Sequence, residues 1–163
     1  MAAVPKPTLR AGRVVLVPQT IDQARALLEG RDVGLDLGPG YPHADTGDAL
    51  RMWVEHGGPD DGGWFVTLAD DGRVVGDCGT AGPPDDEGRQ EIGYGLAAPF
   101  RGQGLGTEAV RVMADWLATL PEVRALTADV EVGNQASRRL LERLGFSLVG
   151  ERDGHWQLTR SPA

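Results

Sequence analysis

A glycine-rich turn lies between a strand pattern and a helix pattern, and it constrains the fold more than any other feature of the sequence. Residues 91–96 predict a strand, and after Leu105 apolar residues recur at helical spacing as far as Pro121. Three alternate glycines remove side chains from the turn: Gly102, Gly104 and Gly106. Because the first N–H groups of a helix have no intrahelical partner and lie at the positive end of its dipole, the turn predicts a phosphate site.

The glycine spacing excludes two common phosphate motifs. A P-loop requires Lys and then Ser or Thr after its last glycine, whereas Thr107 and Glu108 follow Gly106. A Rossmann fingerprint requires a third glycine at the position that Thr107 occupies. The turn is therefore expected to hold a different phosphate ligand.

The remaining patterns predict one α/β domain with a mixed, mostly antiparallel twisted sheet flanked by helices. Strands are expected at residues 14–17, 64–69, 73–78, 91–96, 125–130, 146–151 and 155–159, and helices at residues 20–28, 45–56, 105–120 and 134–144. A right-handed crossover would make the strands at 91–96 and 125–130 parallel. Residues 1–8 are Pro-rich and are expected to form a flexible tail before a domain that spans residues 9–160.

The composition of the chain limits the classes of partner and ligand that we expect. The 163 residues suit a single domain, and the net charge of −8 argues against nucleic acid while weakly favouring a cationic substrate. One cysteine and three scattered histidines predict no metal site. No segment approaches the ~20 apolar residues of a membrane span, so we expect no membrane partner and a cytoplasmic location. A homodimer remains open.

Two blocks of the sequence carry a family resemblance. Arg101-Gly102-Gln103-Gly104-Leu105-Gly106 resembles the (Gln/Arg)-x-x-Gly-x-(Gly/Ala) signature of the GNAT superfamily of acyl-CoA N-acyltransferases. Asn134-Gln135-Ala136-Ser137, followed by residues 141–146, resembles the second GNAT block. Glu91-Ile92-Gly93-Tyr94 and Thr107-Glu108-Ala109 are similar to the RimJ/RimL-type branch. The likeness covers about residues 9–160.

The resemblance implies direct transfer of an acetyl group from acetyl-CoA to a primary amine, on a protein N-terminus or a small molecule. The glycine-rich turn would then hold the pyrophosphate of coenzyme A. Cofactor contacts are expected from Leu96, Ala97, Arg101, Gly102, Gln103, Gly104, Leu105, Gly106, Thr107, Asn134 and Arg139. Two alternatives stay open: a non-catalytic acyl-CoA sensor on the same fold, and a transferase for a larger acyl group such as succinyl.

Catalysis requires a base, an oxyanion donor and a donor to the leaving thiolate. An ammonium group must lose a proton before it attacks a thioester, and Glu91 is the first candidate for this base, with His43 as the second. Many family members have Tyr where this chain has Leu141, so Ser137 becomes the candidate donor to the thiolate. The resemblance to the GNAT superfamily implies that a backbone N–H beside a bulge in the strand at 91–96 is the oxyanion donor.

The loops at 30–44, 57–63 and 82–88 are expected to form the entrance for the acceptor. The candidate acceptor contacts are His43, Trp53, Asp77 and Tyr94. Several of the singled-out residues have a structural alternative: His43 as a solvated loop residue, Trp53 as a core residue, Asp77 as a hairpin charge, and Ser137 and Asn134 as helix caps.

Overall fold

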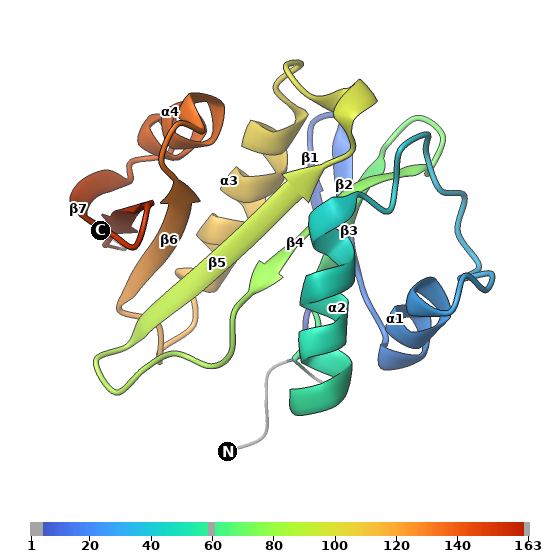
Figure 1. The fold of residues 1–163 in the computed structure, drawn as a ribbon, viewed down its shortest axis with the longest axis horizontal. Helices are drawn as coiled ribbons and strands as arrows, with labels where there is room; N and C mark the ends of the chain where they lie inside the picture. The colour runs from blue at the N-terminus through green and yellow to red at the C-terminus, as the bar shows by residue number, and fades with distance from the viewer. Residues whose placement is uncertain (1–4, 59–60, 162–163) are drawn as a thin grey trace.

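The computed structural model describes residues 5–58 and 61–161. Within them the chain forms one eight-stranded sheet in the order β1-β2-β3-β4-β5-β6-β8-β7 (Figure 1). The strands are β1 (Leu9–Ala11), β2 (Val14–Pro18), β3 (Trp64–Leu68), β4 (Val74–Thr80), β5 (Arg89–Leu96), β6 (Ala125–Glu131), β7 (Ser147–Arg152) and β8 (His155–Arg160). Among the eight strands of the described residues, only β5 and β6 pair in parallel, so the expectation of a mixed, mostly antiparallel sheet is confirmed.

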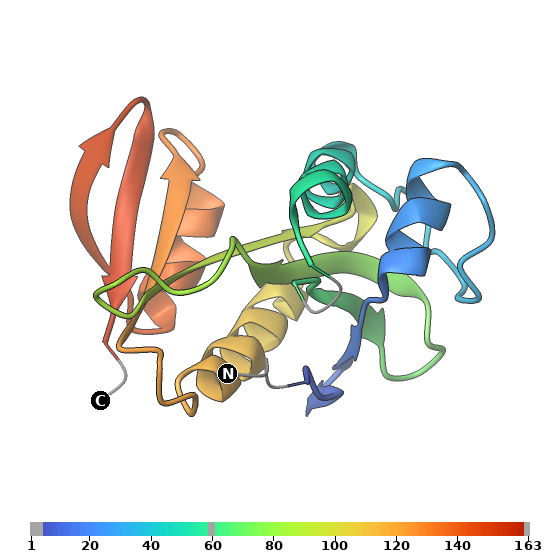
Figure 2. The ribbon, with the colours of Figure 1, turned by 90° about the horizontal axis from the view of Figure 1, so that it is seen from below.

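The helices cover both faces of this sheet. They are α1 (Ile21–Leu28), α2 (Ala44–His56), α3 (Leu105–Leu117) and α4 (Gln135–Arg143), with a short 3-10 turn, η1 (Ala98–Phe100), before α3. Figure 2 shows α1 and α2 on one side of the sheet and α3 on the other. No helix in the described part of the chain is both long and apolar enough to cross a membrane.

The interior is built mainly between α3 and the sheet. One face of α3 carries the apolar residues Leu105, Ala109, Val110, Met113, Ala114 and Leu117, all buried. The sheet face that meets α3 carries Trp64, which packs on Trp116 of α3, and the paired residues Leu16 and Val66, all buried. The packing therefore fixes the start of α3 relative to β4 and β5.

The structure differs from the sequence expectations at element ends. The strand β1 was not predicted, and it extends the sheet by pairing with β2 from Leu9↔Leu16 to Ala11↔Val14. The helix α3 ends at Leu117, before the expected limit at residue 120. Residues 1–4 of the predicted tail lie outside the described residues.

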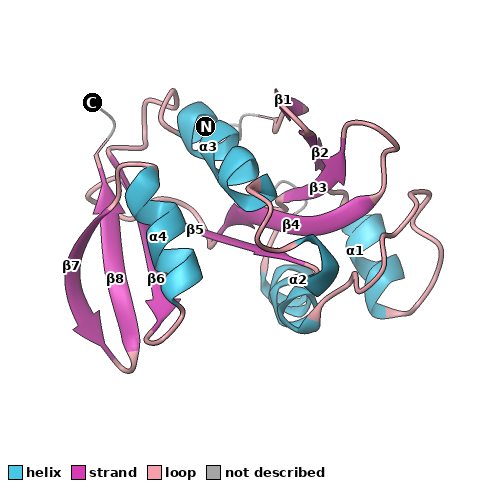
Figure 3. Cartoon of the chain, turned by 90° about the horizontal axis from the view of Figure 1, so that it is seen from above, coloured by secondary structure: helices cyan, strands magenta, loops and turns pink. Residues whose placement is uncertain are grey.

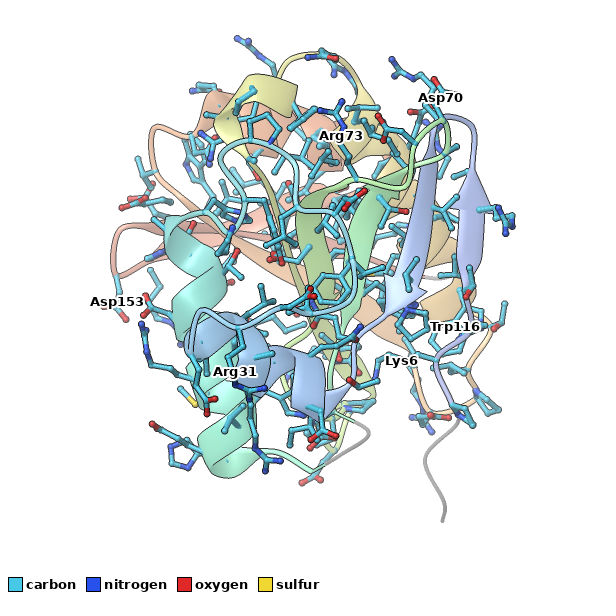
Figure 4. The ribbon with its side chains drawn as sticks, turned by 90° about the vertical axis from the view of Figure 1, so that its right-hand side faces the viewer. Lys6, Arg31, Asp70, Arg73, Trp116 and Asp153 are labelled. Atoms are coloured by element: carbon cyan, nitrogen blue, oxygen red, sulfur yellow. The ribbon has the colours of Figure 1, made fainter. Side chains whose placement is uncertain are left out.

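The segment just before β1 contacts β3. The Trp64 indole N–H donates to the Pro7 carbonyl at 2.8 Å, and the Lys6 ammonium lies 5.9 Å from the centre of the Trp64 ring. Trp116 of α3 packs edge-on against the same ring, and Figure 4 shows Lys6 and Trp116 near each other. At the β3–β4 turn, labelled by Asp70 and Arg73 in the same view, the Arg73 guanidinium lies over Phe100 of η1.

The feature that positions the site is the separation of β5 from β6. The two strands pair only from Arg89↔Ala125 to Glu91↔Thr127, whereas β5 remains paired with β4 as far as Leu96. Figure 3 shows β5 turning away from β6 and its neighbours. The β4–β5 register runs unbroken, so the bulge expected in this strand is not present. The separation leaves the β6-facing edge of β5 without a partner strand past Glu91.

Candidate active site

The glycine-rich turn leads into α3 without a side chain that caps the helix. Gly104 is the N-cap of α3, with a left-handed φ of 84° and no side-chain hydrogen bond to the first turn. By contrast, Thr20 caps α1 and Asn134 caps α4 through their side chains. The first amides of α3 are therefore left to an external acceptor, which fits the predicted phosphate site.

Side chains around this turn hold its backbone in place. The Arg101 Nε donates to the Leu96 carbonyl at 2.9 Å, and the Gln103 amide donates to the Pro99 carbonyl at 3.1 Å. Arg13, in the turn just before β2, donates through Nη2 to the Gln103 carbonyl at 2.8 Å and through Nε to Glu108 at 3.1 Å. We call residues 101–107, held in this way, the phosphate turn.

The other expected cofactor residues lie around the phosphate turn. Leu96 and Ala97 end β5 and lead into η1, Leu105 is buried, and Gly106 faces Leu140 of α4. Arg139 is an exposed residue of α4, and Asn134 is exposed at its start. The capping role of Asn134 is confirmed, because its Oδ1 accepts from the Ser137 N–H at 3.2 Å. Contact of Asn134 and Arg139 with coenzyme A stays a prediction.

Ser137 and Tyr94 meet across the opening between β5 and β6. The Tyr94 hydroxyl lies 2.5 Å from the Ser137 Oγ and also donates to the Ser137 carbonyl at 3.3 Å. Burial raises the pKa of Tyr94, so its phenol keeps its proton at neutral pH. Leu141, by contrast, is fully buried in the core. The sequence pointed to Ser137 as a donor but did not reveal this link to Tyr94.

A cavity of about 560 Å³ lies between α2 and the strands β4 and β5. We call it the α2 pocket. Residues from distant segments line it, among them His43, Trp53, Asp77, Glu91 and Tyr94. The structure thus brings the candidate base Glu91 and the four candidate acceptor residues to one cavity, and their roles stay predictions. Trp53 is buried and forms wall of the pocket as well as core.

A hydrogen-bonded cluster surrounds Asp77 at one end of the α2 pocket. The Asp77 Oδ2 accepts from the Thr46 hydroxyl at 2.8 Å and from the Tyr41 hydroxyl at 3.0 Å. The His43 Nε2 lies 3.8 Å from Oδ1, and His43 Nδ1 lies 3.1 Å from the Thr46 hydroxyl. Burial raises the pKa of Asp77, and the hydrogen bond from Thr46 partly offsets that rise.

Glu91 lies on β5 at the point where β5 and β6 separate, and it also borders the α2 pocket. Its side chain is partly buried. Burial raises the pKa of Glu91, and the negative charge of Asp129 raises it further. A carboxylate with a raised pKa is a better proton acceptor, so Glu91 is suited to the role of base that the sequence predicts for it.

Three residues of the site were missed from the sequence. Tyr41 and Thr46 hold Asp77, and Arg13 holds the phosphate turn. Arg13 lies ninety positions from Gln103 in the chain, and no local pattern marks such a contact. The sequence predicted the loop that contains Tyr41 near the acceptor, but it did not predict the hydrogen bond from Tyr41 to Asp77 on β4.

Comparisons with known proteins agree with this geometry. The family model of the acetyltransferase (GNAT) domain matches residues 13–147. The uncharacterized N-acetyltransferase YjdG of Bacillus subtilis (strain 168) is 28% identical over 123 residues, which span 72% of this chain and 73% of YjdG. The uncharacterized N-acetyltransferase p20 of Bacillus licheniformis is 33% identical over 85 residues, about half of each chain.

Solved structures share the fold over nearly the whole chain. An acetyltransferase from Agrobacterium tumefaciens str. C58 superposes with a TM-score of 0.64 at 22% identity, covering 98% of this chain and 96% of its own. RimL, a ribosomal L7/L12 alpha-N-protein acetyltransferase solved in complex with coenzyme A, superposes with a TM-score of 0.68 at 18% identity, covering 95% and 98%. With the family model matching most of its length, the chain belongs to the GNAT family of acetyltransferases.

Proposed function

We propose that this protein transfers an acetyl group from acetyl-CoA directly to a primary amine, on a small molecule or a protein N-terminus. The position of β5 is the observation that supports this best. Glu91 on β5 borders the α2 pocket, Tyr94 on β5 reaches Ser137 across the opening to β6, and β5 leads into the phosphate turn. One strand thus links a candidate acceptor site, a candidate thiolate donor and a candidate phosphate site.

In this proposal the phosphate turn binds the pyrophosphate of acetyl-CoA through its backbone amides. The unpaired edge of β5 offers N–H and C=O groups to the pantetheine arm, and one of these N–H groups would stabilise the oxyanion. The family resemblance to the RimJ/RimL-type branch is consistent with this placement.

The proton steps follow from the positions of Glu91 and Ser137. Glu91 accepts a proton from the ammonium group, directly or through a water, and the neutral nitrogen then attacks the thioester carbonyl carbon. The new C–N bond forms and the C–S bond breaks; the second proton of the nitrogen passes to the departing sulfur, and the first leaves Glu91 for solvent. Ser137, hydrogen-bonded to Tyr94, donates to the departing sulfur. The products are an amide, free coenzyme A and one released proton.

Release of free thiol from acetyl-CoA in the presence of a panel of amines tests the proposal. We expect turnover with at least one amine, a large loss of kcat in Glu91→Gln, and retained affinity for coenzyme A in that variant. Tight binding of coenzyme A with no thiol release for any amine would instead favour the sensor. A panel of acyl-CoA donors separates acetyl from succinyl transfer.

A further inference from the structure

The floor of the α2 pocket carries no side chains between two carboxylates. Residues directly opposite in an antiparallel pair share a face, and the register pairs Asp77 with Gly95 and Gly79 with Gly93. Because side chains alternate along a strand, Glu91 shares that face with Gly93 and Gly95. Glycine therefore occupies each position of this face between Glu91 and Asp77 on β5.

Two of these glycines are covered and one is open. A Cβ on Gly95 would lie 2.5 Å from the His43 Nε2, and a Cβ on Gly79 would lie 2.9 Å from the Gly63 Cα. A Cβ on Gly93 would meet nothing within 4 Å. The bare strand at Gly93 is thus the accessible part of the floor, with Glu91 on one side and the Asp77–His43 pair on the other.

The α2 pocket is lined by acidic residues without lysine or arginine, as far as the chain is described. The acids are Asp45, Asp61, Asp77 and Glu91. The walls are largely apolar, with Leu50 and Trp53 of α2 among them. Such a cavity favours a molecule with an alkyl chain and positive charge at both ends.

The spacing of the two carboxylates fits an extended chain. Glu91 and Gly95 are four residues apart on β5, which corresponds to about 13 Å between their Cα atoms, and Asp77 lies directly across from Gly95. Glu91 and Asp77 both line the α2 pocket, so the space between their carboxylates is part of this cavity.

We propose that the acceptor is a linear amine with a second cationic group, lying over Gly93 with its reacting nitrogen near Glu91 and its second charge at Asp77. This inference rests on the proposed acetyl transfer and adds the substrate class. The Thr46 and Tyr41 hydroxyls hold Oδ2 of Asp77, and this leaves Oδ1, beside His43, as the atom for the second cation. Gly93 then determines specificity, because any side chain there would occupy the path of the alkyl chain.

The test is thiol release from acetyl-CoA with linear diamines of increasing length, each compared with the monoamine of the same chain length. For the wild-type protein we expect one diamine to have a KM about tenfold or more below that of its monoamine, the effect of one charge-assisted hydrogen bond. In Asp77→Asn the KM of the diamine should rise to that of the monoamine. Equal KM values for diamines and monoamines in the wild-type protein would overturn the proposal.

A second variant guards against loss of the fold in Asp77→Asn. Gly93→Ala adds one methyl group to open space at an ordinary backbone φ, and Gly150→Ala on β7 is the matched control. We expect Gly93→Ala to lower kcat/KM for the preferred diamine severalfold while the affinity for coenzyme A is kept, and Gly150→Ala to change neither. Unchanged diamine kinetics in Gly93→Ala would contradict the proposal.

The outcomes also separate this inference from the proposed function. No thiol release with any amine would refute the acetyl transfer itself. Thiol release with monoamines or peptides, without any preference for a diamine, would leave acetyl transfer intact and refute the substrate class alone.

Discussion

The two proposed ligand sites next to β5, the phosphate turn and the α2 pocket, differ in the groups that they offer. The phosphate turn would bind through backbone amides of one short segment, and its side chains fold back to hold that backbone. The α2 pocket uses side chains from α2, β4, β5 and the loops between them. Backbone groups recognise a part of the ligand that is the same for every acyl-CoA, whereas side chains can change with the acceptor. Substitutions at the two sites should therefore change different kinetic constants.

Glu91→Gln is expected to give the largest effect. If Glu91 accepts the proton of the acceptor, kcat should fall by about a hundredfold or more, while calorimetry shows unchanged affinity for coenzyme A. A wild-type kcat in Glu91→Gln would transfer the role of base to His43. The same experiment on His43→Gln then decides between the two.

Ser137→Ala and Tyr94→Phe test whether the two hydroxyls act as a unit. Each substitution removes one partner of the same hydrogen bond, so we expect each to lower kcat by about tenfold and the double variant to lose little more. Full additivity in steady-state rates would show that the two hydroxyls act independently.

Gly104→Ala tests the phosphate turn. Its φ of 84° is unfavourable for a residue with a Cβ, so the free energy of unfolding should fall by about 1 kcal/mol and the Kd for coenzyme A should rise. Thermal unfolding and calorimetry measure the two effects, with Gly150→Ala as control. Loss of kcat without a change in Kd would contradict the separation of the two sites.

Arg13→Ala should give a smaller effect at the same site. It removes the guanidinium that contacts the Gln103 carbonyl and Glu108, so the KM for acetyl-CoA should rise a few fold while kcat is kept. Arg152→Ala, an exposed arginine on β7, is the matched control. An equal change in both variants would indicate a general effect of charge.

Asp129→Asn should give the smallest effect, a shift in pH dependence. The negative charge of Asp129 favours the protonated form of Glu91, so its removal lowers the pKa of Glu91. The acid limb of the kcat/KM profile should then move to lower pH, by less than the whole perturbation because burial is the larger cause. A shift to higher pH would exclude Glu91 as the group that titrates.

The same raised pKa predicts how Glu91 affects stability. A carboxyl whose pKa is higher in the folded state than in the unfolded state destabilises the fold once it ionises, and it has no such effect at pH values below both pKa values. Glu91→Gln should therefore raise the unfolding temperature at neutral pH relative to wild type, and the gain should disappear in acid. A gain that persists in acid would have another cause.

The sequence predicted the glycine-rich turn and the helix that follows it because all their parts lie within a few residues. Gly102, Gly104 and the start of α3 are one local pattern, and local patterns show in a sequence. The parallel pairing of β5 with β6 followed from the handedness of crossovers. The separation of these strands, the Tyr94–Ser137 contact and the hydroxyls on Asp77 depend on tertiary packing between distant segments, so no pattern along the chain revealed them.

The most direct test is a crystal structure of the complex with coenzyme A. We expect the pyrophosphate on the backbone amides of residues 102–107, the pantetheine along the unpaired edge of β5, and the sulfur beside Ser137 and Tyr94. A pyrophosphate bound elsewhere, or a pantetheine arm lying in the α2 pocket, would contradict this expectation.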